Sequence, residues 1–121
     1  MDSFQKEYYW RMLERERLVP IRFGSRMVGF ITYYIGTNPD KYVRDNPWDV
    51  LDDEPTVGTV CFVDQLITDK NYENWKYSRK VWHDFRDFIR NSYPNVEVIR
   101  WNRVKEGVVH VYYKSITRKR V

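Results

Sequence analysis

Several residue types are scarce or missing in this sequence, and each absence excludes a class of protein. The 121 residues include a single cysteine, Cys61, which cannot form an intramolecular disulfide, so we expect a reducing, cytoplasmic location. No apolar run approaches ~18 residues and the N-terminus is charged, which predicts neither a membrane span nor a secretory signal. The two histidines have no metal-ligand spacing with Cys61 or the acids, and no nucleophile elbow or P-loop is present.

Glycine is absent between Gly58 and Gly107. This segment predicts a buried strand at 60–67, an amphipathic helix at 76–92 and a second strand at 96–103, which together make one βαβ unit. Such units commonly hold a phosphate-bearing cofactor at the helix N-terminus. Glycines usually allow the backbone to approach the phosphates, so their absence argues against a close backbone contact here.

The composition is that of one folded domain spanning residues 1–121. The content of 42% hydrophobic and 17% aromatic residues excludes disorder. The net charge of +4 is unevenly spread, with six acids in a long loop at 37–56 and seven bases from residue 100 onward, including a basic tail at 118–121. These two regions are either separate interaction surfaces or ordinary solvated faces.

Periodicity and turn residues predict the remaining elements. A helix at 3–16, capped by Asp2 or Ser3, carries an apolar stripe that consists of Phe4, Tyr8, Tyr9, Met12 and Leu13. Strands at 18–23 and 27–36 form a hairpin around residues 24–26, and strands at 96–103 and 108–116 form another around 105–107. A short helical turn is expected at 47–51. The order α-β-β-loop-β-α-β-β predicts an α/β (α+β) fold with a mixed sheet.

The helix at 76–92 has an apolar face that should pack on this sheet. Val81, Phe85, Phe88 and Ile89 recur at helical spacing, with Trp82 beside them. We expect Phe85 and Ile89 to be buried together with two residues of the βαβ strands, Phe62 and Ile99.

Two stretches of the sequence resemble a known family. The run at 63–72 (VDQLITDKNY) and the strand at 28–31 (VGFI) resemble the central part of the GNAT (Gcn5-related N-acetyltransferase) family. The resemblance extends over about residues 18–116. It implies acetyl-CoA as the cofactor, N-acyl transfer to a small amine or a protein, and parallel strands at 60–67 and 96–102 that splay apart at their C-terminal ends.

The acyl-CoA loop of that family has the pattern Arg or Gln, two variable residues, Gly, one variable residue, then Gly or Ala. Glu73, Lys76 and Ser78 occupy the three defined positions here. The resemblance implies cofactor binding by Ile67, Lys76, Tyr77, Ser78 and Arg79. Because Lys76 and Ser78 replace glycines and Glu73 repels phosphate, we predict that residues 71–78 form no tight pyrophosphate cradle.

The resemblance also implies two catalytic residues. Asp64 matches the position of a general base, and Tyr112, in a Tyr-Tyr-Lys context, resembles the tyrosine that protonates the leaving thiolate. The alternatives are that Asp64 is an ordinary acid at a strand edge and that Tyr112 packs or stacks, because its segment predicts a strand where the family has a helix.

A non-catalytic binding module is the rival class. The basic C-terminal hairpin, with Arg100, Arg103 and Lys114, is a candidate for nucleic-acid binding, although strand alternation divides its charges between two faces. The acidic loop at 37–56 is a candidate for docking a protein partner. Short GNAT-like proteins that have lost the acyl-CoA loop, including proteins of bacteriophage type, fit this alternative.

Overall fold

The computed structural model describes residues 3–37, 55–72 and 75–116. Within them lie two α-helices, a short 3-10 helix and five strands: α1 (Ser3–Glu14), β1 (Leu18–Phe23), β2 (Arg26–Gly36), β3 (Val60–Thr68), η2 (Lys70–Tyr72), α3 (Trp75–Ser92), β4 (Val98–Lys105) and β5 (Val108–Ser115). The predicted order is confirmed. Asp2, the helical turn at 47–51, most of the acidic loop and the basic tail lie outside the described residues.

Two tight turns set the registers of the hairpins. Phe23 pairs with Arg26 across Gly24, whose φ is 63°, and Lys105 pairs with Val108 across Glu106 and Gly107, whose φ values are 53° and 77°. Positive φ at both central residues of a two-residue loop matches the twist of the flanking strands, which explains the second turn. Both predicted hairpins are confirmed, and β2 begins one residue earlier than predicted.

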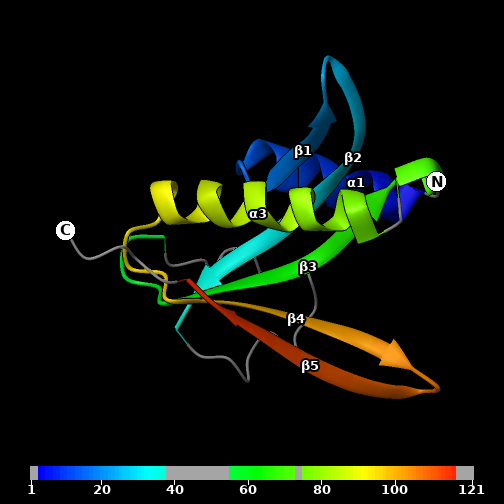
Figure 1. The fold of residues 1–121 in the computed structure, drawn as a ribbon. Coiled ribbons are helices and arrows are strands. Elements are labelled where there is room, and N and C mark those ends of the chain that lie inside the picture. Colours follow the sequence, from blue (N-terminus) through cyan, green and yellow to red (C-terminus); the bar gives the residue numbers. More distant parts are fainter. Residues whose placement is uncertain (1–2, 38–54, 73–74, 117–121) are drawn as a thin grey trace.

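The strands form one mixed sheet in the order β1-β2-β3-β4-β5. β3 and β4 are parallel, as predicted, and their pairing runs from Val60–Val98 to Val63–Trp101. Beyond these residues β3 continues to Thr68 and β4 to Lys105 without pairing with each other, so the predicted splay is confirmed. Figure 1 shows the β4–β5 hairpin diverging from β3 on the side where α3 begins.

Two cores cover the two faces of the sheet. The α3 face contains Phe85 and Ile89, which are 2% and 0% exposed, and Ile99, as predicted. Phe62 is buried as well, but with Tyr8 and Met12 of α1. The prediction that Phe62 packs under α3 is therefore wrong. Alternation along β3 turns Cys61 toward α3 and Phe62 toward α1, so the two helices cover opposite faces.

α1 buries a narrower stripe than its sequence predicts. Tyr8 and Met12 are 3% and 1% exposed, and Tyr9 is half-buried, but Leu13 is 52% exposed. Only the residues that point at β2 and β3 are covered. Leu13 instead lies beside Trp10, which is also exposed, on an apolar surface between α1 and β1.

One glycine is required by close backbone contact. A Cβ atom at Gly29 of β2 would lie 2.0 Å from the carbonyl oxygen of Ile67 in β3. Two strands can approach this closely only where one of them has no side chain. Gly29 belongs to the VGFI stretch of β2 that carries part of the family resemblance.

Candidate functional site

A cleft opens where β3 and β4 stop pairing. Its volume is about 400 Å³, and its walls come from β3, the first half of α3 and the β4–β5 hairpin. The lining residues are Val63, Asp64, Leu66, Ser78, Trp82, Trp101, Asn102, Arg103 and Tyr112. The splay therefore brings together three of the residues that the sequence assigns to a site: Asp64, Ser78 and Tyr112.

Asp64 occupies a bulge in β3. On β2, Thr32 pairs with Gln65 and Tyr33 pairs with Val63, so Asp64 has no partner across the strand pair. An inserted residue of this kind redirects its side chain and bends the strand. The bulge thus places a carboxylate at the point where β3 leaves β4.

A hydrogen-bond network connects the Asp64 carboxylate to α1. The hydroxyl of Tyr8 donates to the Asp64 carboxylate, and the same hydroxyl lies 3.0 Å from Oγ1 of Thr32. Oγ1 of Thr32 also accepts the backbone N–H of Gln65, at 3.2 Å, and the hydroxyl of Tyr9 donates to Oε1 of Gln65, at 2.5 Å. Two tyrosines of α1 therefore hold the side chains of Asp64 and Gln65 in place.

Burial raises the pKa values of both Asp64 and Tyr8. Although the Asp64 residue as a whole is exposed, its carboxylate faces Tyr8, and burial of that end raises the pKa of the carboxyl, while the hydrogen bond from Tyr8 lowers it in part. Burial, and then the charge of Asp64, raises the pKa of Tyr8 so that its hydroxyl keeps its proton. The arrangement holds an acid with an elevated pKa, which is the property that a general base near neutral pH needs.

An aromatic stack from α3 and the β4–β5 hairpin also lines the cleft. The ring of Trp101 in β4 is stacked on Tyr112 of β5, with centroids 5.7 Å apart and planes 14° apart. Trp82 of α3 lies on Trp101, at 4.9 Å between centroids. All three side chains are half-buried, so parts of their faces remain open to the cleft. Tyr112 lies on a strand and stacks on Trp101, as its alternative interpretation predicts.

The other candidate cofactor residues are dispersed. Tyr77 packs its ring on Phe23, at 5.1 Å between centroids, and Ile67 is 42% exposed on β3 beyond the cleft. Arg79 lines a neighbouring basic hollow on α3. The side chain of Lys76 and the loop residues 73–74 lie outside the described part, so the predicted lack of a pyrophosphate cradle stays a prediction.

Arg100 is the residue whose setting differs most from the sequence interpretation. It is 5% exposed, and its guanidinium carbon lies 5.8 Å from the centroid of the Phe62 ring and 5.3 Å from that of Tyr113. Among the described residues its Nε and Nη1 atoms have no hydrogen-bond partner. Arg100 faces the α1 side of the sheet and is buried, so it does not contribute to an accessible surface of the hairpin.

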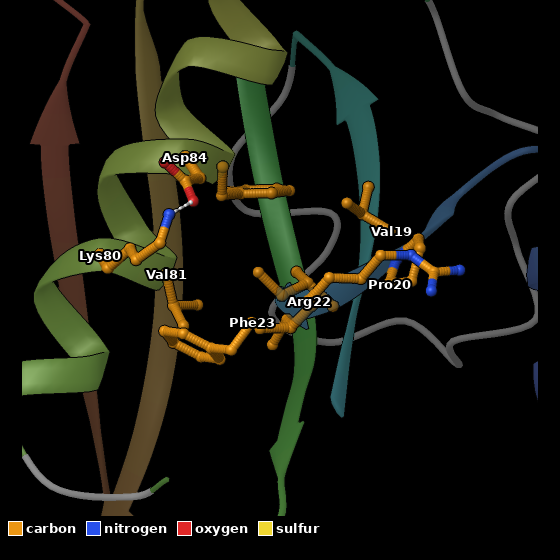
Figure 2. A pocket seen from close by; sticks show the side chains of 10 residues that line it. Val19, Pro20, Arg22, Phe23, Lys80, Val81 and Asp84 are labelled. Carbon is orange, nitrogen blue, oxygen red and sulfur yellow. Dashed lines mark hydrogen bonds and ion pairs between the residues drawn. The ribbon is translucent and has the colours of Figure 1, made fainter. Parts of the chain in front are cut away.

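A smaller hollow of about 80 Å³ lies between β1 and α3, and Figure 2 shows its lining. At its rim, Nζ of Lys80 donates to the Asp84 carboxylate over 2.7 Å and lies 5.9 Å from the centroid of the Phe23 ring. Such a volume holds only a few water molecules. The hollow is a packing defect beside the core, and the larger cleft is the candidate site.

The described part of the chain contains neither a metal-binding cluster nor a membrane-spanning helix. No three His, Cys, Asp or Glu side chains gather there as they would around a metal ion. Neither α1 nor α3 is long and apolar enough for a membrane crossing. The cleft itself offers a carboxylate, two hydroxyl groups and aromatic rings, from Asp64, Ser78, Tyr112, Trp82 and Trp101.

Solved structures of the GNAT type resemble this fold. The loading GNATL domain of CurA from Lyngbya majuscula matches with a TM-score of 0.60 at 16% identity, over 79% of this chain and 49% of that one. A “putative acetyltransferase” from Staphylococcus aureus Mu50 matches with a TM-score of 0.58 at 13% identity, over 92% of this chain and 79% of that one. The chain thus spans about half the length of the first structure. No family model and no curated protein matches the sequence. The chain has a GNAT-like fold.

Proposed function

We propose that this chain is an N-acyltransferase that binds an acyl-CoA thioester in the cleft between β3 and β4. The observation that carries the proposal is the opening of the parallel strand pair after Val63 and Trp101, which places Asp64, Ser78 and Tyr112 around one hollow. The GNAT-like fold supports the same assignment. Acetyl-CoA is the thioester that we expect.

The lining of the cleft fits the narrow, flexible arm of such a thioester. Val63, Leu66 and Trp101 offer apolar surface, and Asn102 offers an amide for hydrogen bonding. The first turn of α3 contains no acidic residue, so its N-terminal dipole is favourable for an anion, and Ser78 lies in that turn. We expect these residues to hold the ligand through its arm more than through its phosphates.

The chemistry requires a proton acceptor and a proton donor. The thioester supplies an activated acyl group and a thiolate leaving group. Asp64 removes the proton of the attacking amine, which approaches from the α1 side of the opening because the hydrogen bond from Tyr8 holds the carboxylate there. Tyr112 holds a hydroxyl at the opposite wall, where it donates a proton to the thiolate. The two residues lie on different strands, and the splay separates them.

Release of free thiol from acetyl-CoA, measured with a chromogenic disulfide and a panel of small amines, tests this proposal. The thiol of Cys61 belongs to a residue that is 0% exposed, so the protein itself contributes little background. We expect amine-dependent thiol release that falls at least ~100-fold in Asp64→Asn, because general-base catalysis contributes ~10²–10⁴-fold. Full activity in both Asp64→Asn and Tyr112→Phe would contradict the assigned roles.

The affinity for acetyl-CoA gives a second, independent test. Because Glu73 and Lys76 depart from the phosphate-binding pattern, we expect a dissociation constant on the order of 0.1–1 mM, and acetyl-pantetheine should bind nearly as well. Calorimetry measures both ligands directly. An affinity tighter than about 10 µM that is lost with acetyl-pantetheine would show that a phosphate cradle exists. Absence of binding at several millimolar would refute the proposed function.

A further inference from the structure

A broad basic groove runs along the outer side of α3 toward the end of β5. Its volume is about 860 Å³, and Lys114 of β5 forms its far wall. The lining residues are Ser78, Arg79, Lys80, Trp82, His83, Asp84, Arg86 and Lys114. Four of these eight side chains are cationic and only one is acidic, so the groove carries a positive potential.

The cations of the groove differ in whether an acidic side chain neutralises them. The one acid, Asp84, is neutralised by Lys80, whose ammonium group also lies over the Phe23 ring (Figure 2). The guanidinium of Arg86 contacts Nδ1 of His83 at 3.2 Å, and within the described residues no acidic side chain forms an ion pair with it. Arg79 and Lys114 are exposed, and no ion pair to either is found within the described residues. Three positive charges are therefore available to an anionic ligand.

The groove is continuous with the aromatic cleft. Ser78 and Trp82 line both hollows, so one surface carries cations on α3 and half-exposed rings between α3 and the hairpin. Trp101 and Tyr112 present stacked rings with nearly parallel planes on this surface, and Arg103 adds a cation beyond them. Cations that follow a groove beside open aromatic faces are the combination found in proteins that bind single-stranded nucleic acid.

We propose that this surface binds a single-stranded nucleic acid, with phosphates along Arg79, Arg86 and Lys114 and a base against the Trp82–Trp101–Tyr112 stack. A duplex keeps its bases stacked inside and offers the rings nothing to contact. An acidic peptide would satisfy the cations but leave the aromatic faces unmatched. The proposal concerns a partner of the protein and does not depend on acyl transfer.

The test is fluorescence anisotropy with a labelled 12-nucleotide DNA strand of mixed sequence, titrated at about 50 and 200 mM salt. Each neutralised phosphate contributes roughly 0.7 to the log–log salt slope for single strands. The triple variant Arg79→Ala, Arg86→Ala, Lys114→Ala should therefore lower the slope by about 2, which means that wild type loses about 15-fold more affinity over this salt range.

A matched variant controls for net charge. The triple variant Arg11→Ala, Arg15→Ala, Arg26→Ala also removes three positive charges. Its three positions are exposed and lie on α1, in the turn after it and at the start of β2. This variant should keep the wild-type slope. If the half-buried Arg86 proves necessary for folding, the double variant at Arg79 and Lys114 should lower the slope by about 1.4.

Three results would overturn the proposal. The first is equal loss of slope in the two triple variants, which would mean a diffuse charge effect. The second is that a duplex of the same sequence, or a 12-residue poly-glutamate peptide, binds with the same affinity as the single strand. Such a result would mean that the aromatic rings do not contact a base. The third is displacement of the strand by an equal concentration of ADP, which would show that the groove takes a single nucleotide.

Discussion

At the scale of single residues, Asp64 combines an unusual backbone position with an unusual environment. It is the inserted residue of a β-bulge, and its carboxylate receives the Tyr8 hydroxyl from a helix 56 positions earlier in the chain. That Asp64 lies in β3 could be predicted from the sequence. Its partner could not, because nothing in the local pattern marks the bulge or shows which face of the sheet α1 covers.

The raised pKa of Asp64 predicts how stability depends on pH. Burial disfavours the charged carboxylate, so the folded protein binds this proton more tightly than the unfolded chain. The contribution of Asp64 to stability is therefore lost as pH rises from the ordinary pKa of aspartate through the elevated folded value. Asp64→Asn should remove this loss, and its unfolding free energy should exceed that of wild type increasingly from pH 4 to pH 7. Urea unfolding followed by circular dichroism measures the difference, and a gap that shrinks with pH would contradict the assignment.

Removing the Tyr8 hydroxyl should shift the acid limb of the activity profile. The hydrogen bond from Tyr8 lowers the pKa of Asp64, so Tyr8→Phe should raise that pKa further and move the limb to higher pH. The dependence of kcat/KM on pH for acetyl transfer reports this value in the free enzyme. Tyr9→Phe is the matched control, because Tyr9 bonds to Gln65 instead. A limb that moves equally in both variants, or in neither, would mean that Tyr8 does not tune Asp64.

At the scale of elements, α3 and both hairpins could be predicted from the sequence. Apolar residues at helical spacing identify the face of α3 that carries Phe85 and Ile89, and glycines mark the two turns. The face on which each strand residue packs was predicted less well. Phe62 and Arg100 are neighbours on the α1 side, where Arg100 lies between two aromatic rings. A charged residue such as arginine normally predicts exposure, and only the pairing of β3, β4 and β5 reveals this burial.

Phe85 should be a principal anchor between α3 and the sheet. It is 2% exposed and contacts Tyr33 and Trp82 edge-on, at 5.7 and 6.2 Å between centroids. Phe85→Ala should lower the free energy of unfolding by ~3–5 kcal/mol. The control Leu13→Ala, at a position 52% exposed on α1, should change it by less than about 0.5 kcal/mol. Thermal and urea melts measure both, and similar losses in the two variants would show that the buried face of α3 is wrongly assigned.

At the scale of the whole molecule, the splay divides the sheet into two parts. β1, β2 and β3 carry α1 on one face, and the β4–β5 hairpin diverges from them (Figure 1). At the end of the sheet where β3 and β4 are still paired, the hydroxyls of Tyr33 and Tyr93 lie 2.7 Å apart. Arg17 donates a hydrogen bond to Tyr93 over 3.0 Å at the same end. The wide end is left open, and the cleft and the basic groove meet there at Trp82. The proposed thioester site and the proposed nucleic-acid surface thus share one opening.

The most direct test of the central claim is to follow the indole N–H signals of the protein during a titration with acetyl-CoA. At 14.9 kDa the protein suits two-dimensional nitrogen–proton NMR, and single Trp→Phe variants assign the signals. If the thioester enters the opening between β3 and β4, the signals of Trp82 and Trp101 move progressively with acetyl-CoA. The signal of Trp10, which is 61% exposed on α1 away from the cleft, stays in place. Unchanged Trp82 and Trp101 signals at several millimolar acetyl-CoA, or movement at Trp10 alone, would contradict the account.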